Sequence, residues 1–352
     1  MFFCVRTIAP MTPSPTTDRD NPTPPRLLPG PAHPPTLPWR QGQTPLMLAP
    51  MQGVTNSALR SLFIDWVRPD VVFTEFMRVN PAAAQRRLSA ADLAEAGSAG
   101  DDVPLVVQLI GHGREALVSG SQAAQDAGAA HINLNMGCPY GRMTSGQTGG
   151  GMLRSPQELS SIIPALRKTI RGTFSIKLRS GYDNPRQIFD LLPLFEASGV
   201  DFLVLHPRTV LQKYAGFADH GITAEAVQRS TLPIIANGDI RSVATGRHVL
   251  RETGAAGLML GRGAISDPLL FQRLRNCAPP DPQPQERAAM LSRYLDELLT
   301  RYQTLFCGEA QILGKIKEIV STIHEPAFEK GFHRLKKARR IEAFRELLAE
   351  LA

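Results

Sequence analysis

Several common features are scarce or missing in this chain of 352 residues, and each absence excludes a class of protein. Only four cysteines occur, none of them in a CxxC pair or at the spacing of metal ligands, so we expect neither a disulfide framework nor a metal site. No apolar run approaches the length of a membrane span, and the apolar start is too short for a secretory signal. We therefore expect a soluble, cytoplasmic protein in a reducing compartment.

Composition sets looser limits. A net charge of +7 permits a polyanionic partner without requiring one. The hydrophobic content of 43% is enough for one large core or two unequal ones. Twelve of the 29 prolines fall within residues 1–45, and a segment of this composition cannot build a packed core. We predict that residues 1–44 form an extended or disordered tail outside the fold.

From Pro45 onward, short runs rich in Val, Ile and Leu alternate with longer stretches of helical periodicity. The predicted strands are 46–49, 71–73, 105–109, 131–134, 174–178, 202–206, 234–236 and 257–260. The predicted helices between them include 56–66, 114–126, 156–170, 186–198, 224–229 and 242–252. Eight β/α units predict an α/β fold, a (β/α)8 TIM barrel over residues 45–277. The alternative is an open doubly wound sheet, but no GxGxxG follows the first strand.

Polar residues occur at the C-terminal ends of these strands, where a TIM barrel carries its active site. With their immediate neighbours, the candidate site residues are, in strand order, Pro50, Met51 and Gln52; Glu75; Gln108; Asn135 and Cys138; Lys177 and Arg179; His206 and Arg208; Asn237, Gly238 and Asp239; and Gly261 and Arg262. One polar residue at a strand end is unremarkable, whereas eight groups in succession predict a single pocket.

The pocket has a recognisable chemistry. Its last two strand ends combine backbone amides with a cation, which favours a phosphate-bearing ligand. Gln108, Lys177 and His206 offer donors to a planar heterocycle, so FMN fits better than a sugar phosphate. Cys138 directly follows a predicted buried strand, and the glycine-rich stretch 146–151 lets backbone or ligand come close. An isolated cysteine is more often structural, but its surroundings here favour a catalytic role.

In this order and spacing the motifs resemble those of the tRNA-dihydrouridine synthases, from about Leu48 to Phe271. The resemblance is carried by segments 49–55, 74–76, 107–109, 135–139, 177–179, 206–209, 236–240 and 261–263, with Tyr214 and Gly216. It implies that FMN is held around Pro50, Met51 and Gln52 and by Gln108, Lys177, His206, Asn237, Gly238, Asp239, Gly261 and Arg262. Substrate contacts are then assigned to Glu75, Asn135, Arg179, Arg208 and Tyr214.

The reaction implied by this resemblance is reduction of the uracil C5–C6 double bond in folded tRNA. NADPH would reduce FMN, hydride would pass from flavin N5 to C6, and Cys138 would donate the proton to C5. A thiol suits this task because its reference pKa of ~8.5 leaves it protonated but acidic enough near neutrality. The target uridine must leave its stack to reach the barrel. Residues 74–79 and 149–151 most resemble the C branch of the family, which acts on a D-loop uridine, with uridine 16 favoured.

A proline-rich linker at 278–284 precedes three segments with helical periodicity, 285–306, 309–323 and 341–351. They predict a small all-helical domain over residues 278–352. Within it lie Lys330, Arg334, Lys336, Lys337, Arg339 and Arg340, with no acid between them. A basic run alone is usually a solvated face; beside this barrel it favours binding to tRNA phosphates.

Two alternatives remain open. One is a different FMN barrel, such as a dihydroorotate or ene reductase, in which Cys138 acts on a small free substrate. The other is a tRNA-binding protein with little turnover, although the complete set of cysteine and flavin motifs argues against it. We expect a monomer.

Overall fold

The computed structural model describes residues 37–83, 87–98, 103–140 and 147–351. Most of the predicted N-terminal tail lies outside these residues. Its last part does not: Trp39 packs edge-on against Phe202, with ring centroids 4.9 Å apart. Packing against the barrel thus begins before residue 45.

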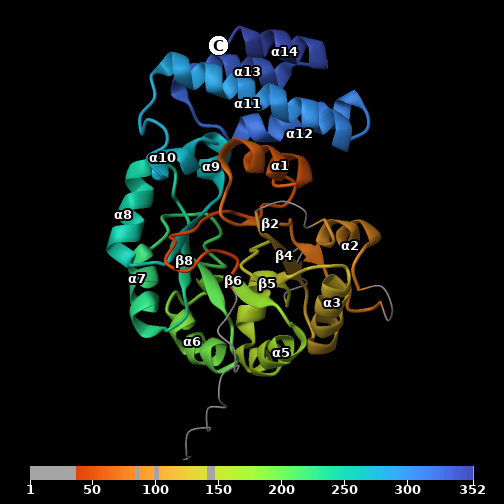
Figure 1. Ribbon diagram of the computed structural model, residues 1–352, viewed down its shortest axis with the longest axis vertical. Helices are drawn as coiled ribbons and strands as arrows, with labels where there is room; N and C mark the ends of the chain where they lie inside the picture. The colour runs from red at the N-terminus through yellow and green to blue at the C-terminus, as the bar shows by residue number, and fades with distance from the viewer. Residues whose placement is uncertain (1–36, 84–86, 99–102, 141–146, 352) are drawn as a thin grey trace, which may run out of the picture.

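Eight parallel strands form the predicted (β/α)8 barrel, which is confirmed (Figure 1). They are β1 (Leu46–Leu48), β2 (Val72–Phe73), β4 (Leu105–Ile110), β5 (His131–Met136), β6 (Thr173–Gly181), β7 (Phe202–Thr209), β8 (Ile234–Asn237) and β9 (Gly257–Leu260). β1 pairs with β9, and a parallel bridge between Met47 and Val71 joins β1 to the start of β2 and closes the ring. A two-residue strand that the sequence did not predict, β3 (Met77–Arg78), also pairs with β4.

The helices form an outer ring around these strands (Figure 1). They are α1 (Ser57–Val67), α2 (Ala90–Ala96), α3 (Arg114–Asp126), α5 (Pro156–Thr169), α6 (Gln187–Ala197), α7 (His220–Arg229) and α8 (Val243–Thr253), followed by the short α9 (Arg262–Ser266) and α10 (Leu270–Leu274). Side-chain capping residues mark the N-terminal ends of several of these helices. The Asn56 side chain caps α1 by accepting from the Leu59 amide, and Ser242 forms a capping box with Thr245 on α8.

The barrel interior changes from apolar to polar along the strands. Its N-terminal floor is a closed cluster of Met47, Ala49, Val71, Phe73, Val106, Phe202, Val204, Ile235 and Met259. Above this floor, Asn133 donates to Ser175 Oγ and Gln108 donates to Asn133 Oδ1, both at 2.8 Å. Buried polar groups are tolerated when they are paired in this way. A polar layer therefore lies between the apolar floor and the C-terminal strand ends. We call these strand ends the barrel mouth.

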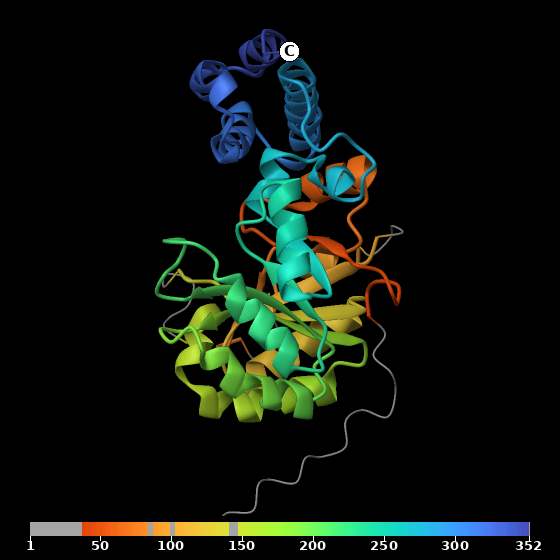
Figure 2. The same cartoon turned by 90° about the vertical axis from the view of Figure 1, so that its left-hand side faces the viewer.

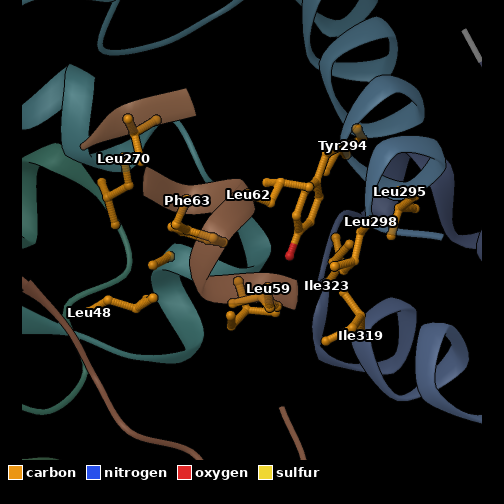
Figure 3. Packing of buried hydrophobic residues seen from close by; sticks show 14 of the residues in the cluster. Leu48, Leu59, Leu62, Phe63, Leu270, Tyr294, Leu295, Leu298, Ile319 and Ile323 are labelled. Carbon is orange, nitrogen blue, oxygen red and sulfur yellow. The ribbon is translucent and has the colours of Figure 1, made fainter. Parts of the chain in front are cut away.

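A helical bundle packs against one side of the barrel, at the top of Figure 1. Its helices are α11 (Pro284–Leu305), α12 (Glu309–Thr322), α13 (Glu329–Lys337) and α14 (Ile341–Ala349). Figure 3 shows the shared core: Leu62 and Phe63 of α1 face Tyr294 and Leu298 of α11. Trp66 Nε1 also donates to Glu297 at 2.6 Å. Because barrel and bundle bury one continuous apolar cluster, their relative placement is fixed by packing.

Within the described residues, no helix combines the length and apolar character needed to cross a membrane.

Candidate active site

A cleft opens at the barrel mouth, where the sequence predicted the site. The predicted residues that line it are Pro50, Met51, Lys177, His206, Tyr214, Asn237, Gly238, Asp239, Gly261 and Arg262. Ala49, Ile240, Arg241, Met259 and Gly263 complete the lining. Met259 and Arg241 had not been assigned to the site. Strict alternation along β9 could have indicated Met259, because it points inward two residues before Gly261.

The main chain of Cys138 is held from two sides. Asn135 Oδ1 accepts from the amides of Gly137 and Cys138, each at 3.0 Å, and Asn135 Nδ2 donates to Gln108 at 2.8 Å. On the other side, the Gly150 amide donates to the Cys138 carbonyl at 3.0 Å. A Cβ on Gly150 would lie only 2.9 Å from that carbonyl oxygen, so the glycine permits this approach. Cys138 is partly exposed, and these contacts hold the main chain of its turn.

Lys177 is the central cation of the cleft. Its Nζ donates to Asn237 Oδ1 at 3.0 Å, and Asn237 Nδ2 donates to the Met259 carbonyl at 2.9 Å. Burial first, and the neighbouring Arg179 cation second, lower the pKa of Lys177 from 10.5 to about 8. The ammonium thus stays mostly charged at neutral pH, and it is oriented by an amide that is itself fixed.

His206 contributes a neutral ring. Burial, followed by the cations of Lys177 and Arg179, holds the pKa of His206 well below its ordinary value. Arg208 lies 3.2 Å from His206 Nε2, and a guanidinium can only donate. Nε2 is therefore the acceptor, and the ring proton is on Nδ1.

Arg179 and Arg208, which the sequence assigned to the substrate, are buried instead. Arg179 donates to the carbonyls of Gly137 and Thr209, at 2.9 and 2.8 Å, and to the carbonyl of Lys213. Arg208 donates to the Gly216 carbonyl at 2.6 Å and to Asp239 at 2.7 Å. Both therefore support residues 210–219 between β7 and α7, the mouth loop, and their exposed fractions of 1% and 2% leave little surface for a direct substrate contact.

Asp239 completes this support. Burial alone would raise the pKa of its carboxyl, but hydrogen bonds from Arg208 and from the Ala218 amide hold the pKa below its ordinary value. Its neighbour Gly238 has φ +120°, and a Cβ there would lie 2.9 Å from His206. A glycine is required because both the backbone angle and the close approach exclude a side chain.

Asn135 and Cys138 are not among the residues that line the cleft, and three other predicted residues also lie off it. Gln52 is exposed. Gln108 is fully buried below the cleft, where its amide orients Asn135. Glu75 is partly buried beside Arg60 and Glu95, and burial raises its pKa to about 7, with Arg60 opposing and Glu95 reinforcing the shift. Its carboxyl Oε1 has no hydrogen-bond partner among the described residues.

The predicted basic run falls on α13 and the residues just after it, a helix that the sequence did not predict. Phe332 and Leu335 bury one face of α13. Arg334 pairs with Glu350, and Arg340 lies 3.5 Å from Glu342. The four remaining cations are exposed, and no partner is found for them in the described part of the chain; we call Lys330, Lys336, Lys337 and Arg339 the α13 patch.

Comparison with known proteins identifies the family. The dihydrouridine synthase (Dus) family model matches residues 47–347, which is most of the chain. The chain belongs to the dihydrouridine synthase family. A probable tRNA-dihydrouridine synthase of Rhodobacter capsulatus is 30% identical over 73% of this chain and 81% of its own length. A tRNA-dihydrouridine(16) synthase of Pasteurella multocida is 32% identical over 64% and 75%, and a tRNA-dihydrouridine synthase B of Pseudomonas syringae is 31% identical over 66% and 68%.

Enzymes of the dihydrouridine synthase family are FMN-dependent oxidoreductases that use NAD(P)H. The cleft fits such a cofactor. It combines the ammonium of Lys177, the Nδ1–H of His206 and the guanidinium of Arg262 with main chain left bare at Gly238 and Gly261. Cations and bare amides suit a phosphate, and a fixed ammonium suits the polar edge of a flavin ring. No cluster of three or more potential metal ligands is found within the described ranges.

Proposed function

We propose that this protein reduces a uridine of tRNA to 5,6-dihydrouridine, with Cys138 as the acid that protonates C5. The observation that carries this proposal is the placement of Cys138, whose thiol lies partly exposed on a turn fixed by Asn135 and Gly150. Family membership supports the reaction, and this geometry supports the residue. A general acid must be held near its target and reach it without rearrangement.

The cleft residues have separate proposed roles. Lys177, His206, Asn237, Gly238, Asp239, Gly261 and Arg262 would hold FMN, with main-chain contacts at Pro50, Met51 and Gln52. When bound, FMN supplies the hydride for uracil C6. Lys177 stabilises negative charge at the flavin's edge, and the neutral ring of His206 donates through Nδ1. Gln108 acts indirectly, by orienting Asn135. Arg179 and Arg208 support the mouth loop by donating hydrogen bonds to the main chain.

The α13 patch is the proposed contact with the tRNA backbone. Four exposed cations without partners in the described structure suit phosphates, which bind through charge rather than through shape. Figure 2 shows α12 and α13 projecting toward the same side of the molecule as the mouth loop, so one RNA can touch both. We propose residues 45–277 as the catalytic domain and 278–352 as the tRNA-binding domain.

We further propose that the target is a D-loop uridine, uridine 16. Support comes from residues 74–79 and 149–151 and from relatives named tRNA-dihydrouridine(16) synthase. Relatives named synthase B match about equally well, so the target position is tested directly below. We propose that the enzyme works as a monomer, with NADPH as reductant, in the cytoplasm where tRNA is modified.

The test is direct. Flavin-loaded protein is incubated with NADPH and unmodified tRNA transcript, and dihydrouridine is mapped by mass spectrometry of nuclease fragments. We expect one modified position in the D-loop. Dihydrouridine at another single position would contradict uridine 16 alone, and steady NADPH oxidation with no dihydrouridine in any transcript would contradict the reaction.

A further inference from the structure

The mouth loop carries an unusual surface. Leu211, Tyr214 and Phe217 expose 59%, 47% and 87% of their area, and Tyr140 beside them exposes 51%. Among the described residues, the only other large apolar side chain exposed to a comparable extent is Leu305, at 42%. Apolar side chains gathered on one rim usually mark an interaction site, whereas isolated ones need no explanation.

The loop holds these side chains on a rigid support. Arg208 donates to the Gly216 carbonyl at 2.6 Å, and the Ala218 amide donates to Asp239 at 2.8 Å. Phe217 therefore sits between two residues that are tied to one ion pair, in which Arg208 is buried and Asp239 is partly buried. Burying an ion pair costs desolvation, and it is weak evidence for stability alone. Here its clear effect is to hold the main chain on both sides of the exposed Phe217.

Cations alternate with the rings on this rim. The partly exposed guanidinium of Arg262 lies 4.9 Å from the centre of the Tyr214 ring, and the buried guanidinium of Arg179 supports the same ring from 5.4 Å. Tyr140 and Tyr214 have ring centroids 6.4 Å apart. Aromatic rings interleaved with cations are the pattern of single-stranded nucleic-acid binding, in which the rings stack on bases and the cations meet phosphates.

We infer that Phe217 and Leu211 bind the unstacked nucleotides that flank the target uridine in tRNA. This rests on the proposed function, because a uridine that enters the cleft leaves its neighbours without a stacking partner. Tyr140 and Tyr214 lie nearer the cleft. Phe217 and Leu211 extend the same surface away from the cleft. The mouth loop replaces the lost stacking and keeps the extruded base in the cleft.

The test compares Phe217→Ala and Leu211→Ala with Leu305→Ala, an exposed apolar residue on α11 rather than on the mouth loop. We expect Phe217→Ala to lower kcat/KM for tRNA about tenfold, Leu211→Ala to lower it less, and Leu305→Ala to leave it unchanged. Flavin content and the rate of flavin reduction by NADPH without tRNA should stay at wild-type values. Phe217→Trp should restore kcat/KM, because an indole stacks as well as a phenyl.

A second readout separates stacking from charge. Removing a phenyl releases no counterions, so the salt dependence of tRNA binding should keep its slope in Phe217→Ala. The inference is wrong if Phe217→Ala matches Leu305→Ala in kcat/KM, or if Phe217→Ala slows flavin reduction as much as tRNA turnover. Wild-type protein that makes no dihydrouridine would instead overturn the proposed function itself.

Discussion

The barrel mouth and the α13 patch both gather cations, and they use them in opposite ways. At the mouth, Arg179 and Arg208 are buried and bind named carbonyls and a carboxylate. On α13, Lys336 and Lys337 are exposed, without partners in the part of the chain that the structure describes. Buried charges with fixed partners set geometry, whereas exposed charges add attraction that salt screens.

The contrast predicts two kinds of behaviour. Changes at the mouth should be large, specific to one residue and nearly independent of salt. Changes on the α13 patch should be graded, roughly shared among its members and strongly dependent on salt. The predictions below test this division, from the largest expected effect to the smallest.

Cys138→Ala should lower the rate of dihydrouridine formation by about 10²–10⁴, the usual contribution of a positioned general acid. Bound flavin and tRNA affinity should be unchanged, because the substitution touches neither the cleft cations nor α13. Single-turnover measurements with pre-reduced enzyme would show the loss. Cys307→Ala, an exposed cysteine between α11 and α12, is the control; a similar loss there would remove the special role of Cys138.

Arg208→Ala should lower the free energy of unfolding by about 3 kcal/mol, because it leaves the Asp239 carboxylate without its main partner. Arg334→Ala breaks an ion pair that is largely exposed on both sides and should cost less than about 1 kcal/mol. Urea unfolding of the two variants compares them directly. Equal losses of unfolding free energy would mean that burial does not decide how much these two ion pairs contribute to stability.

Neutralising Lys330, Lys336, Lys337 and Arg339 together should weaken tRNA binding on the order of 100-fold at physiological salt. The plot of log K against log salt should become shallower, its slope decreasing in magnitude by about 3, because four phosphate contacts are lost. Filter binding across a salt series measures both quantities. Flavin content serves as the control, and an unchanged slope would move the RNA surface elsewhere.

Glu75 extends the comparison to an acid. Its pKa of about 7 in the folded protein exceeds the ordinary value of 4.5, so the folded state binds more protons between these pH values. The free energy of unfolding should therefore fall as pH rises through this window and level off above it. We expect Glu75→Gln to remove about 3 kcal/mol of this fall. The exposed substitution Glu342→Gln should leave the pH profile intact, and a Glu75→Gln profile parallel to wild type would contradict the prediction.

Much of the fold was predictable because its signals are local. The apolar strands and capped helices of the barrel repeat in short windows, and the barrel rule then places Lys177, His206 and Asn237 at one mouth. β3 was missed because two residues show no period. α13 was not predicted because its many charges obscure the apolar pattern. The spacing of Phe332, Leu335 and Ala338 nevertheless indicates a helix with one buried face.

The burial of Arg179 and Arg208 was not predictable for a different reason. A sequence shows that a cation follows a strand, but it does not show whether main-chain carbonyls or solvent will face the guanidinium. Arg179 donates to carbonyls next to two strand ends and Arg208 to carbonyls of the mouth loop, and these groups come together only once the barrel has closed. The same holds for Gln108, whose amide is used by Asn133 and Asn135.

The hydrogen-bonded side-chain amides below Cys138 limit how its thiol is reprotonated between turnovers. Their chain runs from Asn135 through Gln108 and Asn133 to Ser175, and beneath it the barrel floor is apolar. Side-chain amides keep their hydrogens at all ordinary pH values, so this chain holds a shape but does not conduct protons. In the proposed mechanism, a Cys138 thiol that has protonated C5 is therefore not reprotonated through this chain, and its new proton arrives from the side of the cleft.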